Sequence, residues 1–134
     1  MTSQIVIDAS NTILGRLASH AAKQALLGKS VIIVNCNDAI VSGSKANIIA
    51  EYEDIRKKGG ASLKGPFFPK QPDRIVKRTI RGMLSYKHGR GEAAFGRIRC
   101  YNTVPKEHEA AKKTSFASIK NTKTIKLADL SSYI

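Results

Sequence analysis

The 134-residue sequence lacks the features that mark membrane-spanning, secreted or disulfide-stabilised chains. No apolar run approaches the roughly 20 residues that cross a bilayer, and the first residues show no charged-then-apolar signal pattern. Cys36 and Cys100 are the only cysteines and lie far apart, without a C-x-x-C pair. We therefore expect two buried, reduced thiols in a cytoplasmic protein that has no disulfide framework.

Groups suited to catalysis or metal binding are scarce as well. His20, His88 and His108 have no metal-ligand spacing with each other or with either cysteine. Gly28-Lys29-Ser30 resembles the end of a P-loop, but that motif needs a glycine at position 23, which is Lys23. No credible nucleophile is paired with a base. The sequence thus predicts no catalytic, metal or cofactor site and no small-molecule substrate.

Acidic residues are nearly absent from residues 56–99. Asp73 and Glu92 stand there against thirteen lysines and arginines, so this segment has a net charge of +11 out of the chain's +13. A polyanion is the simplest partner for charge this concentrated. A membrane or an acidic protein is an alternative, although membrane binding usually concentrates cations on an amphipathic helix or a tail.

The first third of the chain has the pattern of an α/β protein. Ile5-Val6-Ile7 is typical of a strand, and Val31-Ile32-Ile33-Val34 of a strand buried on both faces. Between them, apolar residues recur at helical spacing from Leu14 to Ala25, and Gly28 stands where such a helix would end. A strand, a helix and a strand joined this closely predict a βαβ unit and a parallel sheet.

Together with 42% hydrophobic residues, this pattern predicts one domain over residues 1–134 with a substantial core. The further elements that we expect are a helix capped by Ser44 with Ile48, Tyr52 and Ile55 as its apolar stripe, a loop at Gly59–Pro72, a helix starting at Pro72, strands at Arg97–Tyr101 and Thr124–Leu127, a short helix at Glu107–Lys113, and a tail to Ile134.

The helix that starts at Pro72 is the most informative element. On a 3.6-residue period, Val76, Ile80, Met83 and Leu84 share an arc that faces the core. Four cations occupy a separate arc of about 100° on the same period, namely Arg74, Lys77, Arg78 and Arg81. Like charges at these spacings repel each other, and a polyphosphate ligand would remove that cost. The alternative is an ordinary solvated basic face.

Two neighbouring segments extend the basic character. Lys87-His88-Gly89-Arg90-Gly91 combines cations with glycines that let a backbone approach a phosphate closely, although the same residues would serve as a plain flexible turn. In the preceding loop, Phe67 and Phe68 lie between Lys64 and Lys70. These rings could stack on unpaired RNA bases, or at least one could be buried against the domain.

Several motifs, in order, resemble a known family over nearly the whole chain. They are Asp8-Ala9, Leu14-Gly15-Arg16-Leu17-Ala18-Ser19, Val34-Asn35, Ser42-Gly43, Gly65-Pro66-Phe67, Pro72-Asp73-Arg74-Ile75, Arg81-Gly82-Met83-Leu84, Arg90-Gly91-Glu92-Ala93 and Val104-Pro105. The family is the universal large-subunit ribosomal protein thirteen family, and the segment from Gly65 to Ile75 resembles its archaeal and eukaryotic branch. The short carboxyl end resembles the archaeal members.

The resemblance implies a three-layer α/β domain with a central, mostly parallel four-stranded sheet flanked by helices. It also implies a structural, non-enzymatic role in the large subunit of the cytoplasmic ribosome, bound to large-subunit ribosomal RNA beside neighbouring ribosomal proteins, with early entry into assembly. An enzyme on the same scaffold and a free-standing nucleic-acid-binding module remain as alternatives. The RNA-binding candidates from residues 56–99 and from the family motifs are Arg16, Lys64, Lys70, Arg74, Lys77, Arg78, Arg81, Lys87, His88, Arg90 and Arg97.

Overall fold

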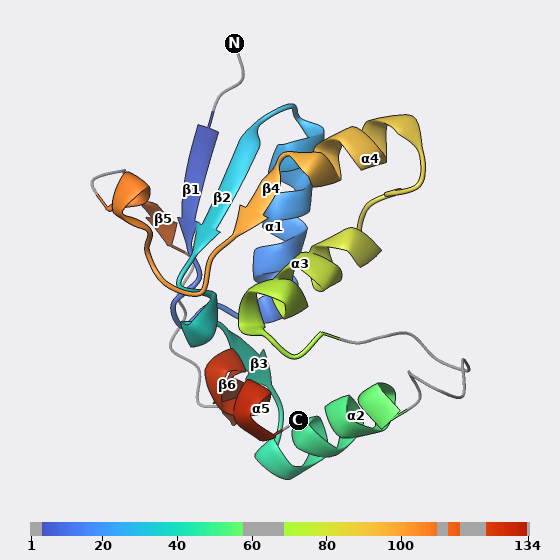
Figure 1. Cartoon of the computed structure of the whole chain (residues 1–134), viewed down its shortest axis with the longest axis vertical. Helices are drawn as coiled ribbons and strands as arrows, with labels where there is room; N and C mark the ends of the chain where they lie inside the picture. The colour runs from blue at the N-terminus through green and yellow to red at the C-terminus, as the bar shows by residue number, and fades with distance from the viewer. Residues whose placement is uncertain (1–3, 58–68, 110–112, 116–122, 134) are drawn as a thin grey trace.

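The computed structural model describes residues 4–57, 69–109, 113–115 and 123–133. At its centre is a four-stranded sheet in the order β4-β2-β1-β5, in which every neighbouring pair is parallel (Figure 1). The strands are β1 (Gln4–Asp8), β2 (Ser30–Val34), β4 (Ile98–Cys100) and β5 (Lys113–Ser115). Residues 31–34 are all buried, as their continuous β-branched run predicts.

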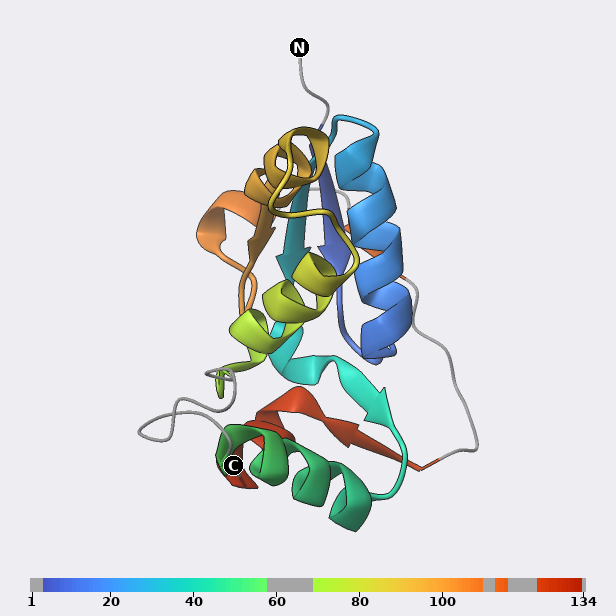
Figure 2. The same cartoon turned by 90° about the vertical axis from the view of Figure 1, so that its right-hand side faces the viewer.

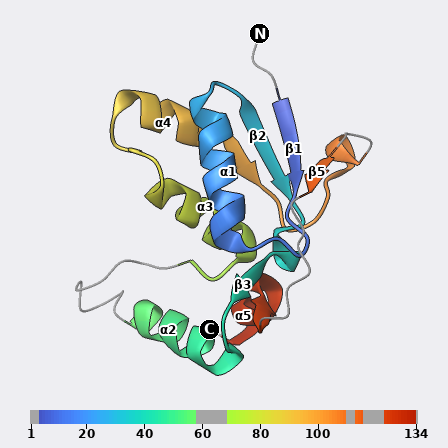
Figure 3. The same cartoon turned by 180° about the vertical axis from the view of Figure 1, so that it is seen from behind.

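Three helices cover one face of this sheet. They are α1 (Leu14–Leu26), α3 (Pro72–Gly82) and α4 (Gly89–Gly96). Seen from behind, α1 lies beside β2, and α3 and α4 pack against α1 (Figure 3). The main core lies between these helices and the sheet, with Ile7, Leu17, Ile33, Ile80 and Ile98 almost wholly inaccessible.

A thinner layer covers the opposite face. There Val6, Ile32 and Val34 pack against Tyr101 and Val104. These two residues belong to the segment that leads into the 3-10 helix η2 (Lys106–His108), which lies opposite α1 when the sheet is viewed along its edge (Figure 2). The predicted three-layer α/β architecture is therefore confirmed.

A second, smaller layer of structure lies beyond the carboxyl ends of the sheet strands (Figure 1). Here β3 (Ile40–Ser42) pairs with β6 (Thr124–Lys126) in antiparallel fashion, and α2 (Lys45–Lys57) and α5 (Leu127–Tyr133) pack around the pair. The 3-10 helix η1 (Cys36–Asp38) joins this layer to β2. Ser44 caps α2 as expected, since its Oγ accepts a hydrogen bond of 3.4 Å from the Asn47 N–H.

The structure corrects three expectations about the last third of the chain. The predicted tail is helix α5, because Leu127 and Leu130 are fully buried and hold it in place. Of the predicted helix at Glu107–Lys113, the described residues form only the single turn of η2, and Lys113 begins β5. In the segment Lys87–Gly91, for which a plain flexible turn was the alternative, residues from Gly89 onward form α4.

Met83 is a fourth correction. The helical arc places it in the core, but α3 ends at Gly82 and Met83 is 45% exposed. Ile75, which that arc omitted, is fully buried instead. Leu84 also follows the helix but is buried as the arc predicts, so beyond Gly82 the helical period no longer predicts every direction correctly.

Gly91 explains how a helix forms over so glycine-rich a segment. It is buried in the first turn of α4, against the loop that follows α3. A methyl group on its Cα would lie 2.2 Å from the Ser85 carbonyl oxygen. Only glycine permits this close approach of the two backbones. The glycine here therefore serves the packing of α4, in addition to any contact with a ligand.

We predict that Gly91→Ala lowers the free energy of unfolding by about 1–3 kcal/mol, because the Ser85 backbone must move to admit the methyl group. Gly89→Ala is the matched control on the same helix, since a methyl group there meets nothing within 4 Å. That control should be neutral or slightly stabilising. Denaturant unfolding of the two variants measures the difference, and equal stabilities would contradict the packing role of Gly91.

Candidate nucleic-acid interface

Helix α3 presents its cations because its other side is buried. Pro72 occupies its first turn, where a missing N–H costs nothing, and Asp73 provides the favourable negative charge there. The Asp73 N–H donates to Asn102 Oδ1 at 2.9 Å, which ties the helix start to the chain after β4. Because Ile75, Val76 and Ile80 face the core, the remaining face of α3 is directed outward.

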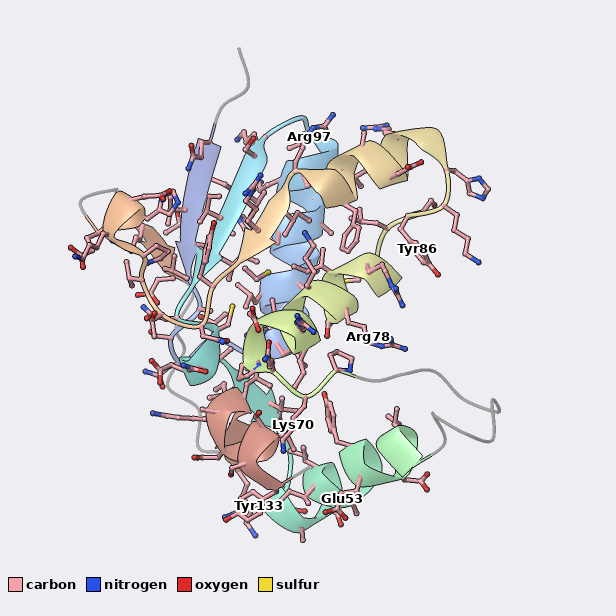
Figure 4. The ribbon with its side chains drawn as sticks, in the orientation of Figure 1. Glu53, Lys70, Arg78, Tyr86, Arg97 and Tyr133 are labelled. Atoms are coloured by element: carbon pink, nitrogen blue, oxygen red, sulfur yellow. The ribbon has the colours of Figure 1, made fainter. Side chains whose placement is uncertain are left out.

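The four cations predicted on one arc do lie together. They line a hollow of about 260 Å³ whose walls are Pro69, Arg74, Lys77, Arg78, Arg81 and Phe95. We call these six residues the basic groove. None of them is acidic, and the shape is an open surface hollow rather than an enclosed cavity. In Figure 4, Arg78 projects from α3 away from the sheet, on the same side of the molecule as Tyr86.

A second hollow of about 310 Å³ continues past α3 toward the sheet edge. Arg74 and Lys77 line both hollows, and Arg99 and Tyr101 enter from β4 and the residue after it. Asp73 is the one acid among the described residues that line it. Cationic side chains therefore extend from α3 to the exposed side of the edge strand.

Lys77 differs from its three arginine neighbours because it is half-buried. Its Nζ donates to the carbonyl oxygens of Ile98 and of Phe95, the latter at 3.3 Å, and lies 4.5 Å from the centre of the Phe95 ring. Burial lowers the pKa of Lys77 below that of an ordinary lysine. Its ammonium group thus joins α3 to the end of α4 and to β4.

Arg90 and Arg97 also bond within the fold. Arg97 Nη1 donates to the Ala25 carbonyl at 2.8 Å, and Arg90 Nη2 donates to the Leu26 carbonyl at 3.3 Å. Both carbonyls lie in the last turn of α1, where the helix dipole favours positive charge. These two arginines therefore anchor α4 and the start of β4 to α1, and neither lines the basic groove.

Tyr86 is a residue that the sequence reasoning missed. The Arg81 guanidinium carbon lies 4.8 Å from the centre of its ring, and Lys87 Nζ lies 5.8 Å from it. This arrangement adds a half-buried aromatic ring beside the basic groove, held between two cations. The available signal was an aromatic residue next to a lysine, five positions after the last arginine of α3.

The other predicted residues surround this surface at varying distances. Lys70 is exposed just before α3 (Figure 4), and Lys87 and His88 are exposed just before α4. Arg16 is exposed on α1 and lines neither hollow. Lys64, Phe67 and Phe68 lie outside the described residues, so the proposed stacking of the two rings stays a prediction.

The two cysteines, distant in sequence, meet beside β4. Both thiols are free, with Cys36 buried and Cys100 partly exposed in the hollow that Arg74 and Lys77 line. A hydrogen bond with Cys100, together with burial, raises the pKa of the Cys36 thiol.

The segment that resembles the end of a P-loop has the wrong structural order for that motif. Gly28 follows helix α1 with a φ of +96° and leads into strand β2, whereas a P-loop follows a strand and leads into a helix.

Other kinds of site find little support in the part of the chain that the structure describes. There, no three histidine, cysteine or acidic side chains are grouped as a metal ion would require. None of the described helices combines the length and the apolar character that crossing a bilayer requires.

Comparison with known proteins identifies the family. The family model described as Ribosomal protein L13 matches residues 2–107. The large ribosomal subunit protein uL13 of Methanosarcina barkeri is 49% identical over 125 residues, which cover 92% of this chain and 81% of the relative. That of Methanococcoides burtonii is 46% identical over 123 residues, which cover 92% and 86%.

A third archaeal relative extends over still more of both chains. The uL13 protein of Methanocaldococcus jannaschii is 42% identical over 132 residues, or 96% of each chain. These relatives are ribosomal structural proteins rather than enzymes. The chain therefore belongs to the ribosomal protein L13 family, in agreement with the resemblance read from its motifs.

Proposed function

We propose that this protein is a structural component of the large subunit of the cytoplasmic ribosome that binds large-subunit ribosomal RNA. It does so through phosphate and shape contacts made by residues 56–99, beside neighbouring ribosomal proteins and early in subunit assembly. The observation that carries the proposal is the basic groove, in which four cations of α3 lie together without an acid. The similarity to large ribosomal subunit proteins supports the large subunit as the assembly in which the basic groove acts.

The physical argument starts from repulsion between the cations. Arg74, Lys77, Arg78 and Arg81 are three, four and seven positions apart, so their charges oppose one another along the helix. RNA phosphates remove this cost and release counterions when they bind. Guanidinium groups also present a fork of donors that matches two phosphate oxygens. The buried side of α3 keeps this pattern in register without help from RNA.

The candidate residues divide into two roles. Arg74, Arg78 and Arg81 face outward and contact phosphates directly, with Lys70, Lys87, His88 and Arg16 as further contacts on the surrounding surface. Lys64, which lies outside the described residues, is proposed as a contact from its sequence alone. Lys77, Arg90 and Arg97 use at least one donor inside the fold, so their main task is to hold the interface in shape. Contacts of this kind position RNA by its backbone rather than by its base sequence.

We predict that affinity for purified large-subunit ribosomal RNA falls steeply with salt. If about 6–10 phosphates are contacted, the affinity should drop by about a thousandfold or more between 50 and 200 mM salt. Binding measured across a salt series gives the slope directly. An affinity that does not change with salt would remove the phosphate mechanism.

Replacement of Arg74, Arg78 and Arg81 by glutamate should keep the protein out of large subunits, since it turns an attractive surface into a repulsive one. The fold should persist because all three side chains lie outside the core, which circular dichroism checks. Sedimentation of tagged protein with large subunits measures incorporation.

The matched control changes three exposed lysines that lie away from the groove, Lys106, Lys123 and Lys126, to glutamate. It alters the net charge equally, so it should incorporate better than the groove variant. Normal sedimentation of the groove variant would contradict the proposal.

A third prediction separates the two roles. Lys77→Met should lower the free energy of unfolding by about 1–2 kcal/mol, because the Phe95 and Ile98 carbonyls lose their donor. Arg74→Gln should change stability by less than about 0.5 kcal/mol while lowering the salt slope of RNA binding by about one. Denaturant unfolding and RNA titrations distinguish the pair. A destabilised Arg74→Gln, or a fully stable Lys77→Met, would reverse the assignment.

A further inference from the structure

A second groove on the molecule is apolar and has no part in the basic groove. It has a volume of about 660 Å³ and lies between the end of α1 and the two ends of the loop that joins α3 to α4. Its principal walls are Ala22, Lys23, Leu26, Leu27, Met83 and Arg90, which we call the apolar groove. No residue of the basic groove contributes to it.

The floor of the apolar groove contains two large apolar side chains that the fold leaves exposed. Leu27 is 61% exposed and Met83 is 45% exposed. They are two of the three large hydrophobic residues that stand exposed in the described part of the chain, and both line this one hollow. Apolar surface gathered in a hollow, rather than scattered singly, is typical of a contact site for another molecule.

The rim of the same groove is positively charged. Lys23 is exposed on α1, a helix that contains no aspartate or glutamate. Arg90 faces it from α4, with its guanidinium steadied by the hydrogen bond to the Leu26 carbonyl. An occupant must therefore offer aliphatic surface to the floor and negative charge to the rim.

These two requirements select one class of partner. RNA could pair its phosphates with the cations of the rim. Its phosphates and its flat bases with polar edges would, however, cover an aliphatic floor of leucine and methionine poorly. A second copy of the chain would bring another +13 of charge against cations already present. A protein segment with an aliphatic side chain between carboxylates meets both conditions.

We propose that the apolar groove receives an acidic segment of a neighbouring protein, which inserts a leucine, isoleucine or methionine side chain over Leu27 and Met83. This inference rests on the proposed residence in the large subunit, but not on RNA binding by the basic groove. The protein then binds two partners at separate surfaces, RNA phosphates on α3 and a polypeptide at the end of α1.

The test is photocrosslinking within purified large subunits. Leu27 is replaced by p-benzoylphenylalanine in one variant and Met83 in another, since both positions are exposed and should tolerate the change. After irradiation, mass spectrometry identifies crosslinked peptides and RNA mapping identifies crosslinked nucleotides. We expect both positions to crosslink to the same protein segment, with aspartate or glutamate beside an aliphatic residue.

Charge reversal at the rim provides the second readout. Lys23→Glu, combined with the probe at position 27, should lower the yield of that crosslink about tenfold, which is the scale of one lost charge contact. Lys106→Glu makes the same change in charge on η2, opposite α1, and should leave the yield unchanged.

The outcomes separate the two proposals. Crosslinks to RNA, to a second copy or to a segment without acids would overturn the docking proposal and leave RNA binding standing. So would the absence of any crosslink from subunits that contain both variants. If even the unmodified protein were missing from large subunits, the proposed function would fail, and the docking proposal with it.

Discussion

The burial of one face of α3 is the constraint on which the rest of the structure depends. The core of the protein buries Ile75, Val76 and Ile80. The three arginines of the same helix, Arg74, Arg78 and Arg81, therefore face outward. The hydrophobic effect thereby holds like charges together against their mutual repulsion. The folded core maintains this charge pattern before any ligand arrives. The repulsion between the cations is therefore already present in the free protein, and an anion that binds would relieve it.

The cations of residues 56–99 are not one uniform surface. Lys77 donates to carbonyls at the end of α4 and in β4, and Arg90 and Arg97 donate to the last carbonyls of α1. Three of these carbonyls, those of Ala25, Leu26 and Phe95, lie at the carboxyl ends of helices, where positive charge is favoured. Some of these positive side chains thus hold the fold together, so a charge count alone overstates the number of cations that are free to contact a polyanion.

The sequence predicted those elements whose pattern depends on their own residues. The β-branched run of β2, the apolar spacing of α1 and the Pro72 start of α3 are local signals, and the structure confirms all three. Helix α4 could not be predicted this way, since its glycines are poor helix formers and it is held by contacts with distant segments, such as the close approach of Gly91 to Ser85 and the bond from Arg90 to Leu26. The inward bonds of Lys77 depend on where α4 ends, which no helical period reveals. The exposure of Met83 follows from the end of α3 one residue earlier.

The loop between α3 and α4 connects the two proposed contact surfaces. Arg81, just before it, lines the basic groove, whereas Met83 and Arg90, within and just after it, line the apolar groove. The loop is fixed at both ends, by the buried side chain of Leu84 and by the backbone contact at Gly91. Because the loop is short and held at both ends, the protein itself sets the spacing between the two surfaces. An RNA bound on α3 and a polypeptide bound at the end of α1 would therefore be held at a fixed separation, which is how a small basic domain can determine the geometry of a larger assembly.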